Sequence, residues 1–323
     1  MKLRHLPALL LTSLPLHADP TPDRPSVIIA TGAGGEETYT ATFARWTEHW
    51  QKAATAAGAQ ISTLPPSEMN ARERLRQTLE TEAKETTAAL WVVLLGHGSF
   101  GGNEAKFNLP GDDLSAAELA AWLQPFQRPV VVVCGFSASG AFLKPLSAPG
   151  RIVVTATRSG AEINYARHGG YLAESIANPS ADLDKDGQTS LLEAWLAAAQ
   201  RTADFYKNEE RLATEHSLLD DNGDGLGTPA DWFQGVRVVK KSSDQRASDG
   251  LRAHQIHLVP SAAERLLPAA KRAERDAVEK ELAELREAKA VLPEDEYFAK
   301  LEALLLRLAE IYREQNREHA GER

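Results

Sequence analysis

Cysteine is almost absent from this chain of 323 residues, in which Cys134 is the only one. A single cysteine excludes an internal disulfide bond, so the fold has to be held together by a hydrophobic core. A chain of this length can form such a core without a disulfide. Cys134 is therefore either a small buried apolar residue, which is the common case, or a reactive thiol.

An excess of basic residues is also absent, because 36 Lys and Arg face 45 Asp and Glu and leave a formal net charge of -9. This charge argues against a nucleic-acid partner, since phosphate binding needs a basic surface. A zinc site is not expected, because the histidines are scattered and no helical pair of them flanks a glutamate. The segment GAGGEE carries Glu37 where a dinucleotide-binding fingerprint needs its third glycine, so no nucleotide cofactor is expected.

The N-terminal apolar run, residues 6–16, is too short to anchor the chain in a membrane. Lys2 and Arg4 precede this run and Ala18 follows it. A basic start, a short apolar stretch and a small residue at the cleavage point are typical of a secretory signal peptide, here residues 1–18. We therefore expect a secreted or periplasmic protein with no membrane attachment after cleavage.

Apolar runs and helical patterns alternate along the first two thirds of the chain. The runs expected to be buried strands are 26–32, 59–64, 88–98, 129–134 and 151–157. The segments expected to be helices are 39–57, 67–84, 115–123, 169–177 and 190–208. This alternation predicts an α/β fold with a mostly parallel sheet and helices on both faces. In such sheets functional sites lie outside the carboxyl ends of the strands.

Residues 259–323 have a different composition and predict a helical hairpin or coiled-coil appendage. Pro293 separates two apolar stripes with helical spacing, and an acidic first turn, 294–296, follows it. The stripes consist of Val278, Leu282, Leu285 and Leu292, and of Phe298, Leu301, Leu305, Leu308 and Tyr312. The hairpin either packs on the main domain or supports self-association through 260–323.

Two strand ends carry residue types that catalysis uses. His97 stands between Gly96 and Gly98 at the end of one apolar run, and the run VVVVCGFSASG places Cys134 and Ser137 at the end of the next. Histidine is the usual general base for a nucleophile, and flanking glycines let a backbone approach a ligand closely. These positions predict a catalytic-type site at the edge of the sheet.

The two strand ends resemble those of the caspase/legumain superfamily of cysteine peptidases, whose motifs are a His-Gly pair and a Cys-x-Ser-Gly segment. The resemblance implies that His97 is the base and that the amide of Gly98 is the first oxyanion donor. Ser139 and Gly140 match the trailing Ser-Gly, so the nucleophile position falls on Ser137.

The early segment IIATGAGGEETYTATFARW is similar to the first strand and helix of legumain-type enzymes. The resemblance covers about residues 26–177 and implies a caspase-like domain over 19–258. Its ligand would be a peptide or a protein.

Serine at the nucleophile position departs from the family. A thiol is partly ionised at neutral pH, whereas a serine hydroxyl needs a base that is itself held by a third group. We therefore expect a catalytically impaired peptidase homologue. Two alternatives stay open: an active endopeptidase that uses His97 with Ser137, or one that uses His97 with Cys134, which stands three residues before Ser137 and on the other face of an extended strand.

Residues 182–193, DLDKDGQTSLLE, have the spacing of an EF-hand calcium loop and are called loop one here. Gly187 at position six makes the sharp turn. The ligands that loop one offers are Asp182, Asp184, Asp186, Gln188, Ser190 and Glu193. The alternative is helix capping, because Ser190 and Glu193 also fit a capping box.

Residues 220–231, DDNGDGLGTPAD, repeat the pattern more weakly and are called loop two. The ligands it offers are Asp220, Asn222, Asp224 and Asp231. Pro229 stands where the exit helix should begin, which favours a single turn over half of an EF-hand pair. The alternative is a polar, glycine-rich loop.

Together these patterns favour a calcium-binding, caspase/legumain-like protein that acts as a binding or regulatory module. The remaining alternative is an interaction scaffold that works through its C-terminal helices.

Overall fold

A seven-stranded sheet forms the centre of the molecule in a computed structural model that describes residues 24–102, 104–240 and 248–321. The strand order is β10-β9-β8-β7-β3-β1-β2. The strands are β1 (Ser26–Thr31), β2 (Gln60–Leu64), β3 (Leu90–Leu95), β7 (Val130–Gly135), β8 (Arg151–Thr155), β9 (Leu218–Asp220) and β10 (Thr228–Pro229). β2, β1, β3, β7 and β8 pair in parallel, and β9 and β10 add an antiparallel edge.

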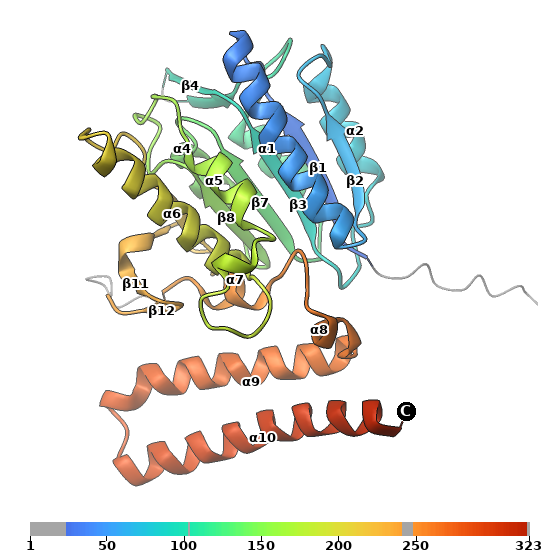
Figure 1. Cartoon of the computed structure of the whole chain (residues 1–323), viewed down its shortest axis with the longest axis vertical. Coiled ribbons are helices and arrows are strands. Elements are labelled where there is room, and N and C mark those ends of the chain that lie inside the picture. Colours follow the sequence, from blue (N-terminus) through green and yellow to red (C-terminus); the bar gives the residue numbers. More distant parts are fainter. Residues whose placement is uncertain (1–23, 103, 241–247, 322–323) are drawn as a thin grey trace, which may run out of the picture.

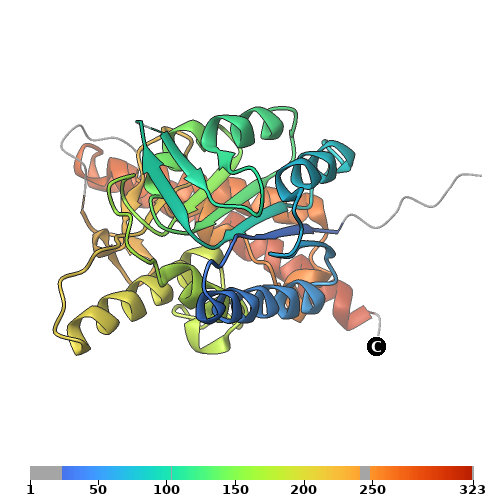
Figure 2. The same cartoon turned by 90° about the horizontal axis from the view of Figure 1, so that it is seen from above.

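Helices cover both faces of this sheet, as Figures 1 and 2 show. One face carries α1 (Glu37–Ala56), α5 (His168–Ser175) and α6 (Leu191–Asn208), and the other carries α2 (Ala71–Thr81), α3 (Ala116–Leu123) and α4 (Gly140–Leu146). The side chains of β7 alternate between the two cores, because successive residues of a strand point to opposite faces. The α/β fold with a mostly parallel sheet and helices on both faces is confirmed.

The structure corrects the start of one helix. The sequence pattern predicts a helix from Ser67, but α2 begins at Ala71. Residues 65–70 instead form a turn in which the amide of Glu68 donates to the carbonyl of Pro65 and the amide of Ala71 donates to that of Glu68. Ser67 therefore lies in the turn that precedes the helix.

Short strands that the sequence does not predict complete the α/β domain. A three-stranded sheet of β4 (Gly98–Gly101), β5 (Glu104–Phe107) and β6 (Leu114–Ser115) follows β3, and β11 (Phe233–Gln234) pairs with β12 (Arg237–Val238). Two to four residues are too few for an alternating pattern to stand out. β4 nonetheless positions the candidate site, because its first residue is Gly98.

The C-terminal segment forms the expected helical hairpin. α7 (Leu251–Gln255) and α8 (Ala262–Leu266) lead into α9 (Ala269–Glu287), and α10 (Glu294–Gly321) returns along α9 (Figure 1). The residues of α10 buried against α9 are Tyr297 and Leu304, with Leu301 and Leu308 partly buried. The contact face is rotated toward Tyr297 and Leu304. Three residues that the sequence assigned to the packed stripe are therefore about half exposed instead: Phe298, Leu305 and Tyr312.

The predicted signal peptide, residues 1–18, lies outside the described residues. Among the residues that the structure does describe, none of the helices combines the length and the apolar character needed to cross a membrane.

Candidate active site and cation loops

His97 follows β3 and its ring is held by aromatic side chains. The ring centroid lies 4.8 Å from that of Tyr39 and 5.0 Å from that of Phe43, both on α1, and 6.1 Å from that of Tyr165. Burial lowers the pKa of His97, against a smaller opposing effect of a hydrogen bond with the backbone of Gly34. The imidazole is therefore neutral at pH 7, which is the form a general base needs.

Ser137 follows β7, and its hydroxyl is bonded to the backbone of Gly98. The Gly98 amide donates to Ser137 Oγ over 3.2 Å, and Ser137 Oγ lies 3.3 Å from the Gly98 carbonyl, to which it donates. Ser137 is only 2% exposed. A Cβ on residue 98 would lie 2.1 Å from the Ser137 carbonyl oxygen, so only glycine allows this approach.

The structure thus brings Gly98 and Ser137 together, as the resemblance implies, but their polar groups satisfy each other. Within the described part of the chain, no hydrogen bond joins the His97 ring to the Ser137 hydroxyl. A substrate carbonyl would have to displace the hydroxyl to reach the Gly98 amide.

Cys134 lies inside β7 and is fully buried. It packs in the core under α2, α3 and α4, whereas the His97 ring contacts α1 on the opposite face. Burial raises the pKa of the Cys134 thiol well above its usual range, so the thiol stays protonated. Its surroundings are those of a packed core residue.

Ser139 and Gly140 fasten the turn after β7 to the end of β8. Ser139 Oγ accepts hydrogen bonds from the amides of Ala156 and Thr157, over 3.0 and 3.1 Å, and the Gly140 amide donates to the Thr157 hydroxyl over 2.9 Å. A Cβ on residue 140 would lie 2.2 Å from the Arg158 carbonyl carbon. The Ser-Gly pair therefore has a structural role in this chain.

In loop one each acidic side chain accepts amides of the loop itself. Asp182 accepts the amides of positions four and six, Asp184 accepts the amide of position five, and Asp186 accepts the amide of position seven. One carboxylate oxygen from each of these three aspartates lies within 4.8 Å of the other two. Oxygens at this spacing fit the coordination shell of calcium, whose ligands lie about 2.3–2.6 Å from the ion.

Glu193, at position twelve, closes loop one with both carboxylate oxygens. Oε1 accepts the amides of Leu183 and Asp184, over 2.8 and 3.2 Å, and Oε2 accepts the amide and hydroxyl of Ser190. The Ser190–Glu193 capping box is therefore present at the start of α6. Ser190 and Glu193, which the EF-hand spacing offers as ligands at positions nine and twelve, are therefore also the capping residues of this helix.

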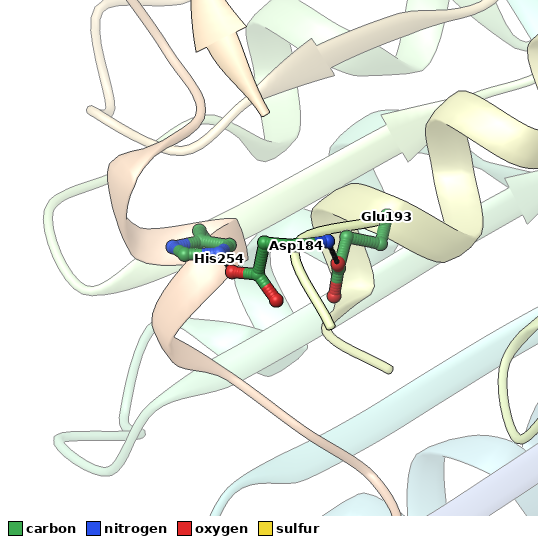
Figure 3. Close-up of side chains that lie close together, drawn as sticks. All are labelled: Asp184, Glu193 and His254. Carbon is green, nitrogen blue, oxygen red and sulfur yellow. Dashed lines mark hydrogen bonds and ion pairs between the residues drawn. The ribbon is translucent and has the colours of Figure 1, made fainter. Parts of the chain in front are cut away.

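His254 of α7 is a member of this cluster that the sequence pattern missed, because it comes sixty-one residues after Glu193. Its Nε2 lies 2.9 Å from Asp184 Oδ2, and ligand atoms of Asp184, Glu193 and His254 lie within 4.8 Å of one another (Figure 3).

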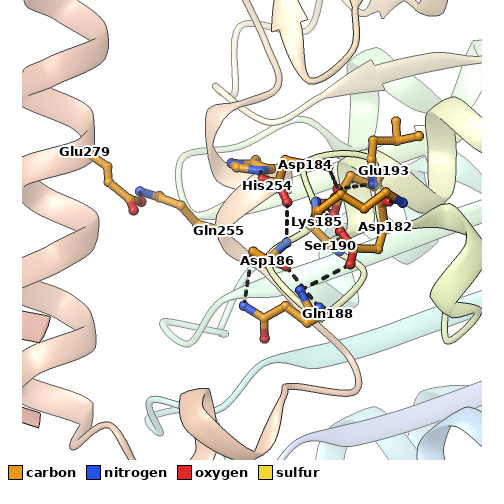
Figure 4. Close-up of polar contacts among 12 residues, drawn as sticks. Asp182, Asp184, Lys185, Asp186, Gln188, Ser190, Glu193, His254, Gln255 and Glu279 are labelled. Carbon is orange, nitrogen blue, oxygen red and sulfur yellow. Dashed lines mark hydrogen bonds and ion pairs between the residues drawn. The ribbon is translucent and has the colours of Figure 1, made fainter. Parts of the chain in front are cut away.

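Loop one also contacts the segment that leads to the hairpin (Figure 4). The Gln188 side-chain oxygen accepts the amide of Ser261 over 3.0 Å, and the amide of Leu191 donates to the carbonyl of Ile256 over 2.9 Å. Gln255 reaches across to Glu279 of α9 over 2.9 Å. The loop is thus fastened on both sides of α7.

Loop two repeats the hydrogen-bond pattern of loop one. Asp220 accepts the amides of positions four and six, over 2.9 and 3.0 Å. Asn222 and Asp224 accept those of positions five and seven, each over 2.8 Å. The first seven residues of the two loops therefore have the same local geometry.

The twelfth position of loop two is filled from elsewhere in the chain. Asp249 Oδ1 accepts the amides of positions two and three, over 2.8 and 3.2 Å, and its Oδ2 accepts the hydroxyl of Thr228 at position nine over 2.6 Å. These are the bonds that Glu193 makes in loop one. Asp231, the ligand expected from spacing, lies instead on η2 (Ala230–Trp232) with a side chain 69% exposed and bonded to Lys240.

Asp249 lies beside a second buried carboxylate, that of Asp221, which accepts the amides of Gly250 and Ala253. Burial raises the pKa of both groups, and the charge of Asp221 raises that of Asp249 further. A cation would relieve the cost of holding this negative charge in the interior.

Comparisons with known proteins bear on the fold. A scan against protein-family models and a search of curated proteins found no match to this sequence. Among solved structures, the chain is similar to the Drosophila initiator caspase Dronc, with TM-score 0.45, 13% identity and coverage of 64% of this chain and 82% of that one.

Two further solved structures are similar. For caspase-1 from Spodoptera frugiperda the TM-score is 0.41, the identity 11% and the coverage 62% and 86%. For protein GSU0716 from Geobacter sulfurreducens the TM-score is 0.40 and the identity 11%, with coverage of 55% of this chain and 89% of that one. These values describe partial likeness of backbone and assign no activity to this chain.

Proposed function

We propose that this chain is a catalytically silent, caspase/legumain-like protein that binds calcium in two loops and acts as a binding or regulatory module outside the cytoplasm. The observation that carries the proposal is the mutual bond between Ser137 and Gly98. It occupies both the hydroxyl in the nucleophile position and the amide in the oxyanion position.

The chemistry of the remaining groups supports the same conclusion. Serine needs a base within hydrogen-bond reach of its hydroxyl, and its proton here is directed at the Gly98 carbonyl. The lone cysteine is a protonated core residue. A neutral His97 is therefore left without a nucleophile to activate.

Calcium binding is supported by the shared geometry of the two loops. Oxygen donors line both loops, and calcium prefers oxygen ligands. Extracellular calcium modules typically bind the ion with dissociation constants of about 1 mM, so they need a medium with that much free calcium. Secretion, which the N-terminal pattern predicts, would supply that condition. The cation in loop one would be held by Asp182, Asp184 and Asp186 with Glu193, and in loop two by Asp220, Asn222 and Asp224 with Asp249.

We expect the wild-type protein to react with neither a fluorophosphonate nor a peptidyl thiol-directed probe, because the hydroxyl is bonded to backbone and the thiol is buried. Labelling should equal that of Ser137→Ala, measured by intact-protein mass spectrometry. Labelling of the wild type that disappears in both Ser137→Ala and His97→Ala would establish an active peptidase and refute the silent one.

For loop one, we expect Asp186→Asn to lower the calcium-dependent rise in melting temperature. After the change Oδ1 still accepts the backbone amide of Gln188, whereas the bond from the Gln188 side-chain amide to Oδ2 and the anionic ligand are lost. The matched control is Asp204→Asn, an exposed carboxylate on α6. If calcium raises the melting temperatures of the two variants equally, loop one does not bind calcium.

A further inference from the structure

The outer helix of the hairpin presents an apolar stripe to solvent. Phe298, Leu305 and Tyr312 are 50%, 48% and 44% exposed, and we call them the outer stripe. They are spaced by seven residues, about two helical turns, so they lie on one face of α10. α10 is the element farthest from the sheet, on the other side of α9 (Figure 1).

This stripe cannot turn inward, because another face of α10 already packs on α9. Tyr297 and Leu304 are buried there. The Tyr312 hydroxyl also lies close to Arg275 of α9, so its ring rests beside the hairpin. The three half-exposed side chains of the outer stripe therefore stay at the surface, about 10 Å apart along α10, where a partner helix can cover them.

The spacing of the stripe makes it complementary to itself. Leu305 lies midway between Phe298 and Tyr312, seven residues from each. When two copies of α10 pack antiparallel about a two-fold axis at Leu305, each leucine meets its own equivalent and each Phe298 meets Tyr312 of the partner subunit. An interface that uses the same patch on both subunits is the commonest arrangement among homodimers.

The charges beside the stripe favour the antiparallel arrangement. Asp295 and Arg313 are eighteen residues apart, about five helical turns, and so lie on the same flank of α10. In an antiparallel two-fold pair the same flanks face each other, which brings Asp295 close to the partner subunit's Arg313. A parallel two-fold pair would instead set this flank against the opposite flank of the partner helix, the side of Tyr297 and Leu304 that packs on α9.

We propose that the partner of the outer stripe is a second copy of this chain, which forms an antiparallel dimer through α10. The two hairpins then make a four-helix arrangement in which Phe298, Leu305 and Tyr312 become buried. The α/β domains lie on the outside, with their cation loops and candidate sites outside the interface.

The test measures the mass of the full chain by sedimentation over a wide range of protein concentrations, with calcium present. We expect a dimer for the wild type and, for Leu305→Glu, a dimer constant weakened about a hundredfold or more, because two carboxylates meet at the two-fold axis. The control is Leu212→Glu, at an isolated leucine that is 91% exposed on the α/β domain. A monomeric wild type, or a dimer unaffected by Leu305→Glu, overturns the proposal.

Cross-linking then tests the orientation. Cys134 is buried, so a short bis-maleimide will react with engineered cysteines alone. Leu305→Cys should cross-link efficiently, whereas the two Phe298→Cys positions should not, because an antiparallel pair holds them about 21 Å apart. Efficient cross-linking of Phe298→Cys would show a parallel pair and overturn the antiparallel arrangement.

Discussion

Replacing Asp249 with asparagine is expected to abolish cation binding in loop two, so calorimetric titration should show two calcium ions for the wild type and one for the variant. The charge that Glu193 supplies to loop one comes to loop two from Asp249, through the same bonds to positions two, three and nine. At free calcium one hundred times the dissociation constant, the stabilisation lost is about 3 kcal/mol.

The matched control for Asp249→Asn is Asp231→Asn. Asp231 stands at position twelve of loop two in the sequence, but its carboxylate is bonded to Lys240 at the surface. This variant should still bind two ions and melt as the wild type does in calcium. Loss of an ion in Asp231→Asn, with two retained in Asp249→Asn, would restore the ligand set expected from spacing alone.

In the calcium-free protein, the buried carboxyl group of Asp249 should make the free energy of unfolding fall as pH rises. A carboxylate held in a salt bridge has the opposite effect. Because burial and Asp221 raise the pKa of Asp249, the folded state holds a proton that the unfolded state has released, at pH values above the ordinary carboxyl pKa of about 4. The contribution of Asp249 to the free energy of unfolding in chelator therefore falls as pH rises from about 4 to about 8, its pKa in the folded state. Asp249→Asn should flatten this fall, measured by urea denaturation at a series of pH values.

Gly140→Ala is expected to lower the free energy of unfolding by about 3 kcal/mol, since overpacking against backbone has no flexible side chain to absorb it. The new methyl group would lie 2.2 Å from both the Arg158 carbonyl carbon and the Ser159 nitrogen. To make room, the turn after β7 must separate from the end of β8, which also breaks the bond between the Gly140 amide and Thr157.

Urea denaturation in saturating calcium measures this loss, with Gly101→Ala as the control. A Cβ on residue 101 would meet no atom within 4 Å, so its effect should stay within about 0.5 kcal/mol. Equal midpoints for the two variants would show that Gly140 is not needed for packing, and its match to the family motif would then have no structural basis.

The sheet could be predicted from sequence because its central strands are buried on both faces. Runs such as those of β3 and β7 are apolar at every position, which a half-exposed strand is not. The edge strands β9 and β10 are only three and two residues long, and β9 reaches β8 across a long connection, residues 156–217. Nothing local in the chain predicts that pairing.

The residues of the candidate site could be predicted from the sequence, but the hydrogen bonds among them could not. The positions of His97 and Ser137 follow from the ends of two parallel strands, but the bond between Ser137 and Gly98 depends on how closely β4 approaches. Asp249 and His254 could not be predicted, because a loop motif describes only consecutive residues and both come from a later segment. Exposure of Phe298 likewise depends on a rotation of α10 that three-four spacing does not determine.

Hydrogen bonds join loop one and the start of α6 to the segment before the hairpin, which lies far away in the sequence. The amide of Ser261 donates to Gln188 and the amide of Leu191 donates to the carbonyl of Ile256, so local opening at the start of α6 would break bonds to the segment that leads into α8. Under the proposed function, an ion that stabilises loop one would therefore also stabilise the attachment of the two long helices to the α/β domain.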